Sequence, residues 1–579
     1  LIERHAVLTV DESGVAHATM PRALMERGRR HAVRIVPIIH HLEQLEHTGL
    51  FEAYPQTRAV GADAICFAQP VVTQVLAQWL TDLGKTSGVS DVMIWLSEEG
   101  KGCQCEECRK EDRFVKEVQV CLQAWERAKQ ECPHLGLRLL LTQASYPSND
   151  KVLGAVPEGV KVSYYNGGLT YDTSRRPMIY PLLEQYAQKG RWLGVYPTLG
   201  ANWLIVAPFS NPGFIHYRMT EFVDKGLRCL VGYAVPSNAY YPVNVEAAAE
   251  WAWNAHGRSV KEFSLAYAVR HGIRPPERFA AWLETIGPVS WDLYGSRFPY
   301  LEYYWRNLQQ IARGRVKVAL GEGFFEEFQR EEQLAENISR CDAALIIAEE
   351  LGHELSILET RIVRGYSRIL QAVWELHKLL EGGKKPEDAD LAATQGWLAQ
   401  MRDACSEVIE LYPRWGAALP GLVADHEAER FWGTVHLMED VLNRLAPLLD
   451  EFGVSDPDRA YRARQVGEWR TEDFAEAREQ VRRIDVSGFV DGPGVYEMQP
   501  RWRDGTLGLG VSRMALVSYP KDRPEELREE SVDVHDGHAG AWIRGDRYVM
   551  ELRDYDARRG YAVLAHIRGG ETTNGAFFF

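Results

Sequence analysis

The amino-acid sequence predicts an α/β protein: a (β/α)8 barrel of the TIM type without its first strand, then an α-helical bundle domain and a small C-terminal β-sandwich. Three patterns support this prediction. Strand-like apolar runs alternate with helical stretches, long apolar stripes of helical spacing follow, and Gly-rich turns with short alternating strands close the chain. At 579 residues the chain is long enough for several domains. We expect them at 1–290, 291–483 and 484–579.

Seven strand-like runs precede residue 240. They are His5–Val10, Ala32–Ile39, Val92–Leu96, Leu137–Leu141, Val160–Tyr165, Trp192–Tyr196 and Leu227–Val235. Helices are expected at Met20–Arg30, Pro70–Leu83, Glu111–Glu131, Pro181–Lys189 and Tyr217–Lys225. Such βα units build a parallel sheet. A closed barrel needs one more strand, which we expect before residue 1. A doubly wound sheet is the alternative, but no Gly-x-Gly-x-x-Gly follows the first run.

The second half of the chain changes character twice. An apolar stripe at helical spacing runs from Leu355 to Leu380, and further stripes cover residues 391–411 and 427–449. They predict a helical support domain. Short strands are then expected at Leu507–Val511, Ala515–Ser518, Trp542–Arg544, Tyr548–Leu552 and Tyr561–His566, with a last one at Gly575–Phe579.

The composition narrows the range of partners. Acidic residues outnumber basic ones by 81 to 66, giving a net charge of −15, and no basic stripe is present, so no nucleic acid partner is expected. No apolar run approaches the roughly 20 residues of a membrane span, so no membrane partner is expected. The 9 Cys residues are odd in number and partly clustered, unlike a secreted disulfide framework. We expect a cytoplasmic location, and the sequence leaves oligomerisation open.

The first candidate for an active site is the segment Asp91–Gly100. Its apolar run brings two adjacent carboxylates, Glu98 and Glu99, to the end of a strand, where barrel enzymes place their chemistry. Glycoside hydrolysis uses one carboxylic acid as proton donor and a second group to stabilise positive charge. Neighbouring strand residues point to opposite faces, so both can serve only if the chain bends there. The alternative is a pair of solvated glutamates that begins a loop.

A thiol cluster follows the carboxylates. Cys103, Cys105 and Cys108 could supply three thiolates to a structural Zn²⁺, and reduced thiols are the alternative. The sequence does not show a fourth ligand, since Cys121 lies on an apolar helical stripe and belongs to a core. No cofactor is expected for catalysis, because no His-rich ligand set accompanies the thiols.

Polar and aromatic residues follow several of the predicted strands. Their type suits a sugar, which aromatic rings stack against and amide or imidazole groups hydrogen-bond. The candidates for substrate binding are His40, His41, Tyr164, Tyr165, Asn166, Trp203, Tyr233 and Tyr240. Taken singly, the two histidines are as compatible with packing and the other residues are more often packing than ligand, but together they favour a carbohydrate partner.

An ordered set of segments over residues 5–270 resembles a known group of enzymes. Val36–Glu43, with Tyr54-Pro55 and Cys66–Pro70 downstream, resembles the third barrel strand and loop of glycoside hydrolase family 20 β-N-acetylhexosaminidases. Ile94–Gly100 resembles their fourth strand, and Ala247–Asn254 their last helix, which is also similar to family 84. The loop with the three thiols looks more like a poorly characterised group of barrels related to hexosaminidases and α-glucuronidases.

The resemblance implies roles for the two carboxylates. Glu99 would be the general acid, and Glu98 would stand where family 20 uses Asp to orient the 2-acetamido group of the substrate, which replaces a carboxylate nucleophile. Tyr165 or Tyr233 would contact the intermediate. The implied function is a retaining exo-glycosidase that removes a terminal N-acetylhexosamine. The alternatives are a related α-glucuronidase-like enzyme for an acidic sugar, with Arg175 or Arg176 as its basic residue, and a non-catalytic carbohydrate-binding barrel.

Overall fold

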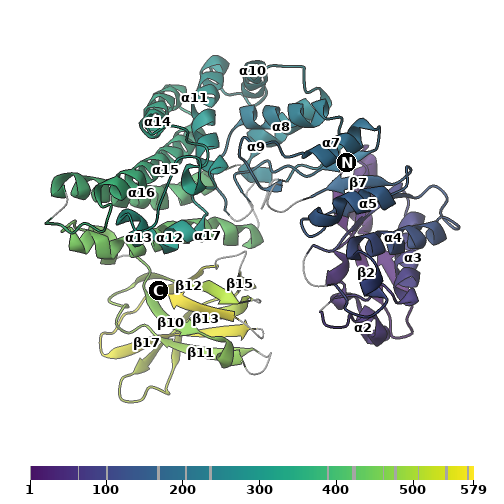
Figure 1. Ribbon diagram of the computed structural model, residues 1–579. Helices are drawn as coiled ribbons and strands as arrows, with labels where there is room; N and C mark the ends of the chain where they lie inside the picture. Colours follow the sequence, from purple (N-terminus) through teal and green to yellow (C-terminus); the bar gives the residue numbers. More distant parts are fainter. Residues whose placement is uncertain are drawn as a thin grey trace.

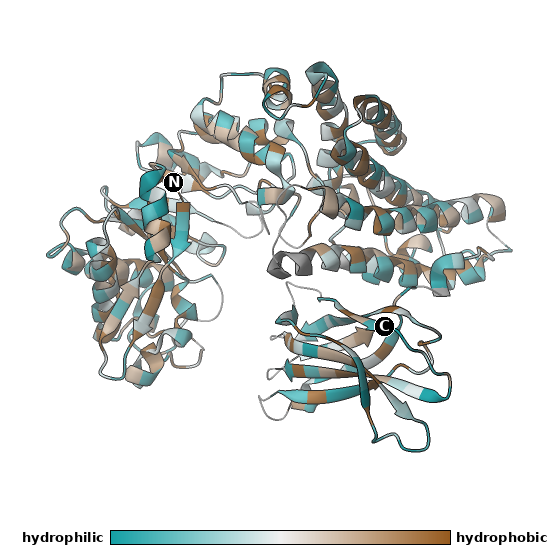
Figure 2. Cartoon of the chain, turned by 180° about the vertical axis from the view of Figure 1, so that it is seen from behind, coloured by the Kyte–Doolittle hydropathy of each residue, from teal (hydrophilic) through white to brown (hydrophobic). Residues whose placement is uncertain are grey.

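The computed structural model describes residues 2–579 except 63, 99–101, 166–169, 203–204, 234–237, 388–389, 420–424, 461, 475–478, 506–507, 541–545 and 570–572. Figure 1 shows an N-terminal region of sheet and helices, a helical middle and a C-terminal region of sheets. The helical middle bridges the other two, which stand apart on either side of it in both views (Figures 1 and 2).

The N-terminal region is built on a curled sheet of seven strands in which all neighbours are parallel. Their order follows the sequence: β1 (Ile2–His5), β4 (Ile35–Ile39), β5 (Asp91–Trp95), β6 (Gly136–Leu141), β7 (Lys161–Tyr164), β8 (Leu193–Val195) and β9 (Cys229–Leu230). The Tyr196 hydroxyl after β8 donates a hydrogen bond to Glu3 on β1, so the sheet curls round towards itself. Within the described part of the chain β1 and β9 do not pair. The sheet is an open half-barrel.

The first strand differs from the predicted His5–Val10. Ile2–His5 pairs with Ile35–Ile38 in the large sheet, whereas β2 (Val7–Val10) forms a separate antiparallel hairpin with β3 (Ala16–Thr19). The alternation in Val7–Val10 explains the difference. Leu8 and Val10 are buried while Val7 and Thr9 are exposed, as expected for a strand with one solvated face.

Helices alternate with these strands and then continue beyond the sheet into the helical middle. They are α1 (Arg22–Arg30), α2 (Leu50–Ala53), α3 (Pro70–Lys85), α4 (Arg113–Ala128), α5 (Asn149–Ala155), α7 (Pro181–Gln188), α8 (Pro212–Asp224), α9 (Pro242–Trp253), α10 (Val260–Arg270) and α11 (Pro276–Gly295). All five helices predicted in this region are present. The strands β4 and β5 are buried on both faces: Val36, Ile38 and Met93 form an inner cluster, and alternate residues such as Ile39 join the helix-facing core.

The middle region contains α12 (Glu302–Arg306), α13 (Leu308–Ala312), α14 (Glu332–Leu351), α15 (Glu354–Leu379), α16 (Leu391–Ala418) and α17 (Asp425–Glu451). The last three match the predicted stripes. Seen from behind, the long helices carry both hydrophobic and hydrophilic residues (Figure 2). Their buried residues are continuous with the helix-facing core of the half-barrel, so the two regions share one core. No described helix combines the length and apolarity that a membrane span requires.

The C-terminal region has two sheets and its own core. One sheet orders β10 (Gln465–Trp469), β18 (Thr573–Phe578), β12 (Gly494–Gly505) and β16 (Tyr548–Leu552). The other orders β11 (Gln480–Asp485), β17 (Arg559–Gly569), β13 (Leu509–Pro520) and β14 (Arg528–Asp533), with β15 (Gly537–Ala539) also paired to β13. The expected last strand is present. The runs predicted near 507–511 and 515–518 belong to the single strand β13, and Trp542–Arg544 lies outside the described residues.

The division at 290 and 483 stays a prediction. Helix α11 runs across the first of these positions, and β10, which pairs with the last strand, lies before the second. The sheet-rich region therefore begins at Gln465.

Candidate active site

Two loops that leave neighbouring strands carry the candidate active site. His40 and His41 directly follow β4, and Glu98 follows β5 by three residues. Because the strands are parallel, their carboxyl ends lie at the same edge of the half-barrel. This arrangement brings His41 into contact with Glu98, although the two residues are 57 positions apart in the sequence.

His41 and Glu98 form a largely buried ion pair. The His41 Nε2 atom lies 3.1 Å from Glu98 Oε2, and the two side chains are 4% and 18% exposed. The other ring nitrogen, Nδ1, lies 2.8 Å from the carbonyl oxygen of Leu96. Burial opposes the charge on the imidazole, but the hydrogen bonds to Glu98 and Leu96 outweigh it and raise the pKa of His41. Burial also opposes the charge on Glu98, yet His41 keeps the pKa of that carboxyl below its usual range. The arrangement favours an imidazolium paired with a carboxylate.

The backbone around Glu98 is fixed by side chains from three other segments. The Glu98 N–H donates to Glu43 Oε1 at 2.7 Å, and the Ser97 N–H donates to Glu117 Oε2 at 3.0 Å. The Thr142 hydroxyl donates to the Ser97 carbonyl at 2.5 Å. These bonds hold the bend that turns the chain out of β5. Site prediction from the sequence had missed Glu117 and Thr142, because nothing in their local sequence distinguishes them.

Glu117 is itself held by a charge. Its other oxygen accepts a hydrogen bond from Arg113 Nε at 2.9 Å, one helical turn away on α4. Complete burial raises the pKa of Glu117, and the nearby Arg113 lowers it only in part. Helix α4 thus serves the site by presenting a buried acceptor to the peptide that precedes Glu98.

The rings of His5, His40 and Trp95 lie beside His41 on one side of the ion pair. The rings of His5, His40 and His41 lie 5.0, 5.5 and 4.8 Å from that of Trp95, between centroids. Loss of solvation, together with the charge of His41, lowers the pKa of both His5 and His40 to about 4. At neutral pH these two are uncharged imidazoles, able to donate and accept hydrogen bonds.

Four tyrosines form the other side. The ring of Tyr165 lies 6.1, 6.3 and 6.3 Å from those of Tyr171, Tyr196 and Tyr233. Tyr165 is also close enough to Glu98 to help lower the pKa of that carboxyl. Burial raises the pKa of Tyr165 and of Tyr233, so both remain phenols that can donate a proton in a hydrogen bond. The concave face therefore combines a fixed carboxylate with aromatic surface, which suits a sugar.

The predicted residues divide into three groups. Glu98, His40, His41, Tyr165 and Tyr233 come together on the concave face. Glu99, Asn166 and Trp203 lie outside the described residues. Tyr164 and Tyr240 lie elsewhere, and their assignment to substrate binding needs correction.

Tyr164 and Tyr240 are both core residues. Tyr164 is fully buried in the helix-facing core, with its ring 5.7 Å from that of Tyr180, because successive strand residues point to opposite faces and Tyr165 takes the concave one. Tyr240 is 3% exposed and packs against Trp415 and Phe431 of the helical region, at centroid distances of 5.9 and 6.3 Å. Neither is open to a sugar.

The arginines proposed for an acidic sugar are held by carboxylates. Arg175 pairs with Asp292 at 2.7 Å and with Glu327 at 2.6 Å, and its guanidinium lies 4.5 Å from the centre of the Trp291 ring. Arg176 pairs with Asp172 and with Glu326, both at 3.0 Å. These contacts tie the loop to the helical region.

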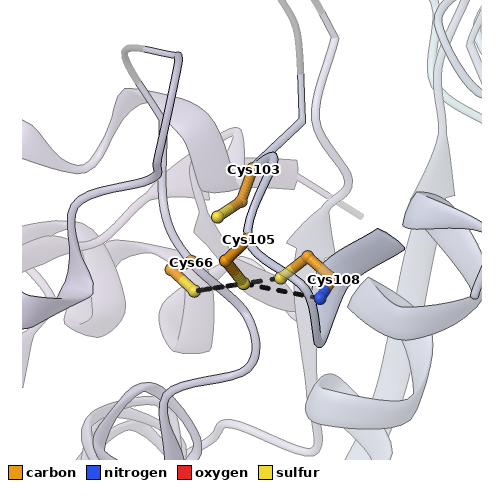
Figure 3. Close-up of side chains that lie close together, drawn as sticks. All are labelled: Cys66, Cys103, Cys105 and Cys108. Atoms are coloured by element: carbon orange, nitrogen blue, oxygen red, sulfur yellow. Dashed lines mark hydrogen bonds between the residues drawn. The ribbon is translucent and has the colours of Figure 1, made fainter. Parts of the chain in front are cut away.

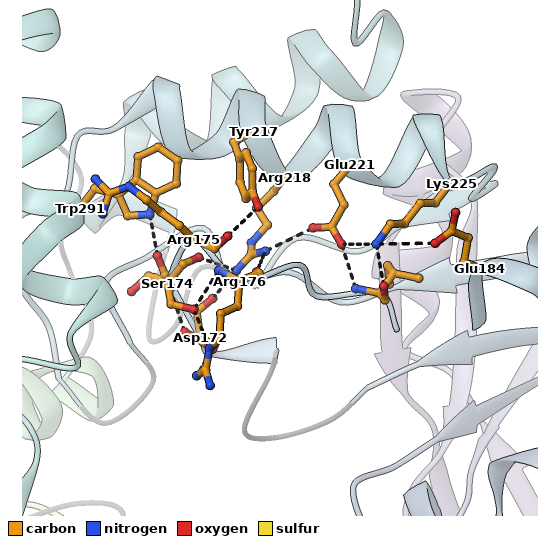
Figure 4. A network of polar contacts seen from close by, with 12 residues as sticks. Asp172, Ser174, Arg175, Arg176, Glu184, Tyr217, Arg218, Glu221, Lys225 and Trp291 are labelled. Atoms are coloured by element: carbon orange, nitrogen blue, oxygen red, sulfur yellow. Dashed lines mark hydrogen bonds and ion pairs between the residues drawn. The ribbon is translucent and has the colours of Figure 1, made fainter. Parts of the chain in front are cut away.

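A buried arginine of α8 organises the same loop. Figure 4 shows Arg218 reaching among the loop residues, where it donates to the carbonyl oxygens of Asp172 at 3.1 Å and Ser174 at 2.9 Å. The loop that carries Arg175 and Arg176 therefore has a structural role that accounts for its charges.

The thiol cluster contains four cysteines. Cys66, from the segment between β4 and α3, joins Cys103, Cys105 and Cys108, and the four sulfurs all lie within 4.8 Å of one another (Figure 3). The sequence did not identify Cys66 as the fourth member, because it lies far upstream of the other three. Its only signal was its position inside the segment Cys66–Pro70 that entered the family resemblance.

No family model and no curated protein matches the chain. The solved structures that are similar over much of its length include the following three. A GH138 enzyme targeting pectin rhamnogalacturonan II is 11% identical, with a TM-score of 0.47, and the match covers 96% of this chain and 75% of that one. A GH115 4-O-methyl-α-glucuronidase with specificity for decorated arabinogalactans is 13% identical, with a TM-score of 0.40 and coverage of 96% and 76%.

The third is a mutant of the O-GlcNAc hydrolase from Thermobaculum terrenum. It is 9% identical, with a TM-score of 0.35, and the match covers 75% of this chain and 84% of that one. With TM-scores below 0.5, these likenesses assign the chain to no family.

Proposed function

We propose that this protein is a glycoside hydrolase that removes a terminal sugar, with Glu98 as the carboxylate that orients and stabilises the reacting centre and Glu99 as the general acid. The observation that carries the proposal is the buried His41–Glu98 pair at the carboxyl end of β5. A carboxylate held ionised cannot donate a proton, but it can stabilise the positive charge of an oxocarbenium-like transition state.

The neighbouring position then supplies the proton. Glu99 follows Glu98 directly, and a negative charge on Glu98 raises the pKa of an adjacent carboxyl group. When two neighbouring carboxyl groups have different pKa values, one is protonated and the other ionised at the same pH. Glycoside hydrolysis needs one group in each of these states. Tyr165, which helps to lower the pKa of Glu98, and Tyr233 provide phenol groups beside the anion.

The substrate that fits this arrangement best is an N-acetylhexosaminide. In the proposed mechanism Glu98 accepts a hydrogen bond from the 2-acetamido N–H, and the acetamido oxygen attacks the anomeric carbon while Glu99 protonates the leaving oxygen. Water then attacks the anomeric carbon of the cyclic intermediate, and Glu99 takes its proton. The configuration is retained without a carboxylate nucleophile. The pairing of Glu98 with His41 favours this role, because a buried ion pair holds the carboxylate in one orientation.

An acidic sugar is the second candidate. It requires a cation beside the substrate, and the two arginines proposed for that purpose each pair with two carboxylates. This is why we rank an N-acetylhexosaminide first.

The test is a panel of p-nitrophenyl glycosides that includes β-N-acetylglucosaminide, β-N-acetylgalactosaminide and α-glucuronide, run with the wild type and with Glu98→Gln. We expect turnover of an N-acetylhexosaminide, lowered at least a hundredfold in the variant. Glu52→Gln, at an exposed position of α2, is the matched control and should keep full activity. Turnover of the glucuronide alone would favour the second candidate, and turnover of no glycoside would favour a carbohydrate-binding barrel.

A further inference from the structure

The sulfurs of four cysteines meet where two loops of the half-barrel lie side by side. Cys66 belongs to the segment between β4 and α3, and Cys103, Cys105 and Cys108 belong to the segment between β5 and α4. We infer that these four thiolates bind one structural Zn²⁺, and that the ion joins the two loops that carry the His41–Glu98 pair. The inference concerns metal binding and holds whether or not the protein is a glycosidase.

The spacing of the sulfurs agrees with a tetrahedral site. Zinc–sulfur bonds of about 2.3 Å at tetrahedral angles place any two sulfurs about 3.8 Å apart. The Cys66 sulfur lies 3.8 Å from that of Cys105 and 3.8 Å from that of Cys108. A disulfide would need about 2.05 Å, and all four cysteines are free thiols.

Backbone N–H groups point at two of the sulfurs. The Cys108 N–H donates to Cys105 Sγ at 3.4 Å, within the same turn (Figure 3), and the Val60 N–H donates to Cys103 Sγ at 3.3 Å. Such bonds stabilise a thiolate more than a thiol, since the anion is the better acceptor. Four thiolates this close would repel one another, and a divalent cation removes most of that repulsion.

The donor set also indicates which metal is bound. Four thiolates in a tetrahedron suit zinc or iron, and a site with four protein ligands leaves no open position for catalysis. Nothing in the cluster supplies the oxygen ligands that magnesium or calcium requires. We assign a closed structural zinc site.

The position of the site gives it a mechanical role. The Gln104 N–H donates to the Val60 carbonyl at 2.8 Å, so backbone as well as thiols link the two segments. The cluster begins five residues after Glu98 in the chain. Zinc at this place restrains the exit of the Glu98 segment from β5, and its removal should loosen that segment before the sheet itself unfolds.

The experiment is metal analysis of the full chain expressed with added zinc and purified without chelator. We expect about one zinc per chain in the wild type, less than a tenth of that in Cys66→Ser, and the wild-type content in Cys132→Ser. Cys132 is a buried cysteine outside the cluster that donates to the Thr81 carbonyl, a bond that serine can keep. A wild type without zinc, a wild type that holds iron, or a Cys66→Ser variant with its full zinc content would overturn the inference.

A second measurement covers the case in which Cys66→Ser does not fold. Native wild-type protein is titrated with a mercurial that reacts with thiolates, while a zinc indicator follows release. We expect one zinc to be released as four thiols react. Release of no zinc, or release complete after two thiols, would contradict a four-thiolate site.

Discussion

Replacing His41 with glutamine removes the positive charge that faces Glu98 but retains a side chain able to donate a hydrogen bond. The pair is 3.1 Å long and largely buried, so solvent screens it little. Glutamine keeps a hydrogen bond to the carboxylate but not the opposite charge, and an opposite charge within about 4–6 Å lowers the pKa of a carboxyl group by about 1–3 units. The substitution should therefore destabilise the ionised form of Glu98 relative to the protonated form by about 1–2 kcal/mol. One pKa unit corresponds to about 1.4 kcal/mol, so the pKa of Glu98 should rise by about one unit.

The assay is the pH dependence of kcat/KM on the substrate found in the glycoside panel. If ionised Glu98 is required, activity falls on the acidic side as that carboxyl is protonated. In His41→Gln this acidic limb should move up by about one pH unit, while the maximal rate falls less than in Glu98→Gln. His47→Gln, on the same loop, is the control. An acidic limb at the same pH in His41→Gln and the wild type would refute the coupling of the two side chains.

The same pair makes stability depend on pH in a defined direction. The folded-state pKa of Glu98 is lowered from 4.5 and that of His41 is raised from 6.5. The Glu98 contribution is complete above 4.5 and is lost as pH falls through the lowered value. The His41 contribution is complete below 6.5 and is lost as pH rises through the raised value. Both contributions are therefore fully present between pH 4.5 and pH 6.5. Urea unfolding at a series of pH values should show the wild-type advantage over His41→Gln to be largest there, and an advantage that grows above pH 8 would contradict it.

Three further substitutions probe the frame of the site. Glu117→Leu leaves Arg113 without its buried partner and should lower the free energy of unfolding by about 3 kcal/mol in urea. A change below about 0.5 kcal/mol, the size of a surface effect, would contradict the role of this acid. Asp91 lies at the opposite end of β5, where it pairs with Arg138 at 2.9 Å. Because that end of a barrel serves stability, Asp91→Asn should lower the melting temperature and leave kcat within about twofold. A large loss of kcat in folded protein would argue against a purely structural role for Asp91. Glu359 is fully buried, which raises its pKa from 4.5 to about 7, so ionisation costs stability as pH rises through that range. Glu359→Gln should gain stability relative to the wild type between pH 5 and pH 8, measured by thermal unfolding, and an unchanged difference would refute the shift.

Elements with a clear period could be predicted from the sequence. The α15 stripe is buried at Leu358, Ile362, Tyr366 and Ile369, as its three- and four-residue spacing requires. Six of the seven predicted strand runs correspond to strands of the parallel sheet. Five of these, β4 to β8, have apolar residues buried on both faces, whereas β9 is only half-buried.

The exception is the first strand, and its physical reason is plain. Ile2–His5 is mostly exposed along its length and contains three polar residues, so it has no apolar signature. The more apolar Val7–Val10 attracted the assignment instead. An edge strand of this kind is defined by its partner, β4, and not by its own composition.

The candidate site was predictable only in part. Strand ends identified Glu98, His41 and Tyr165, because parallel strands bring their carboxyl ends together. The alternation of side chains should have separated Tyr164 from Tyr165, since only one of two neighbours can face the concave side. Contacts between distant segments, such as Cys66 with the later thiols, depend on how loops pack and carry no local pattern.

The most direct test of the central claim is the dependence of Glu99→Gln on the leaving group. A variant that lacks the general acid should hydrolyse a glycoside with a 2,4-dinitrophenyl leaving group at close to the wild-type rate, because that group departs without a proton. It should hydrolyse the corresponding p-methoxyphenyl glycoside at least a thousandfold more slowly, within the range that general acid catalysis supplies, about 10²–10⁴-fold. Equal losses on the two substrates, or no loss on either, would contradict the assignment of Glu99 as the acid.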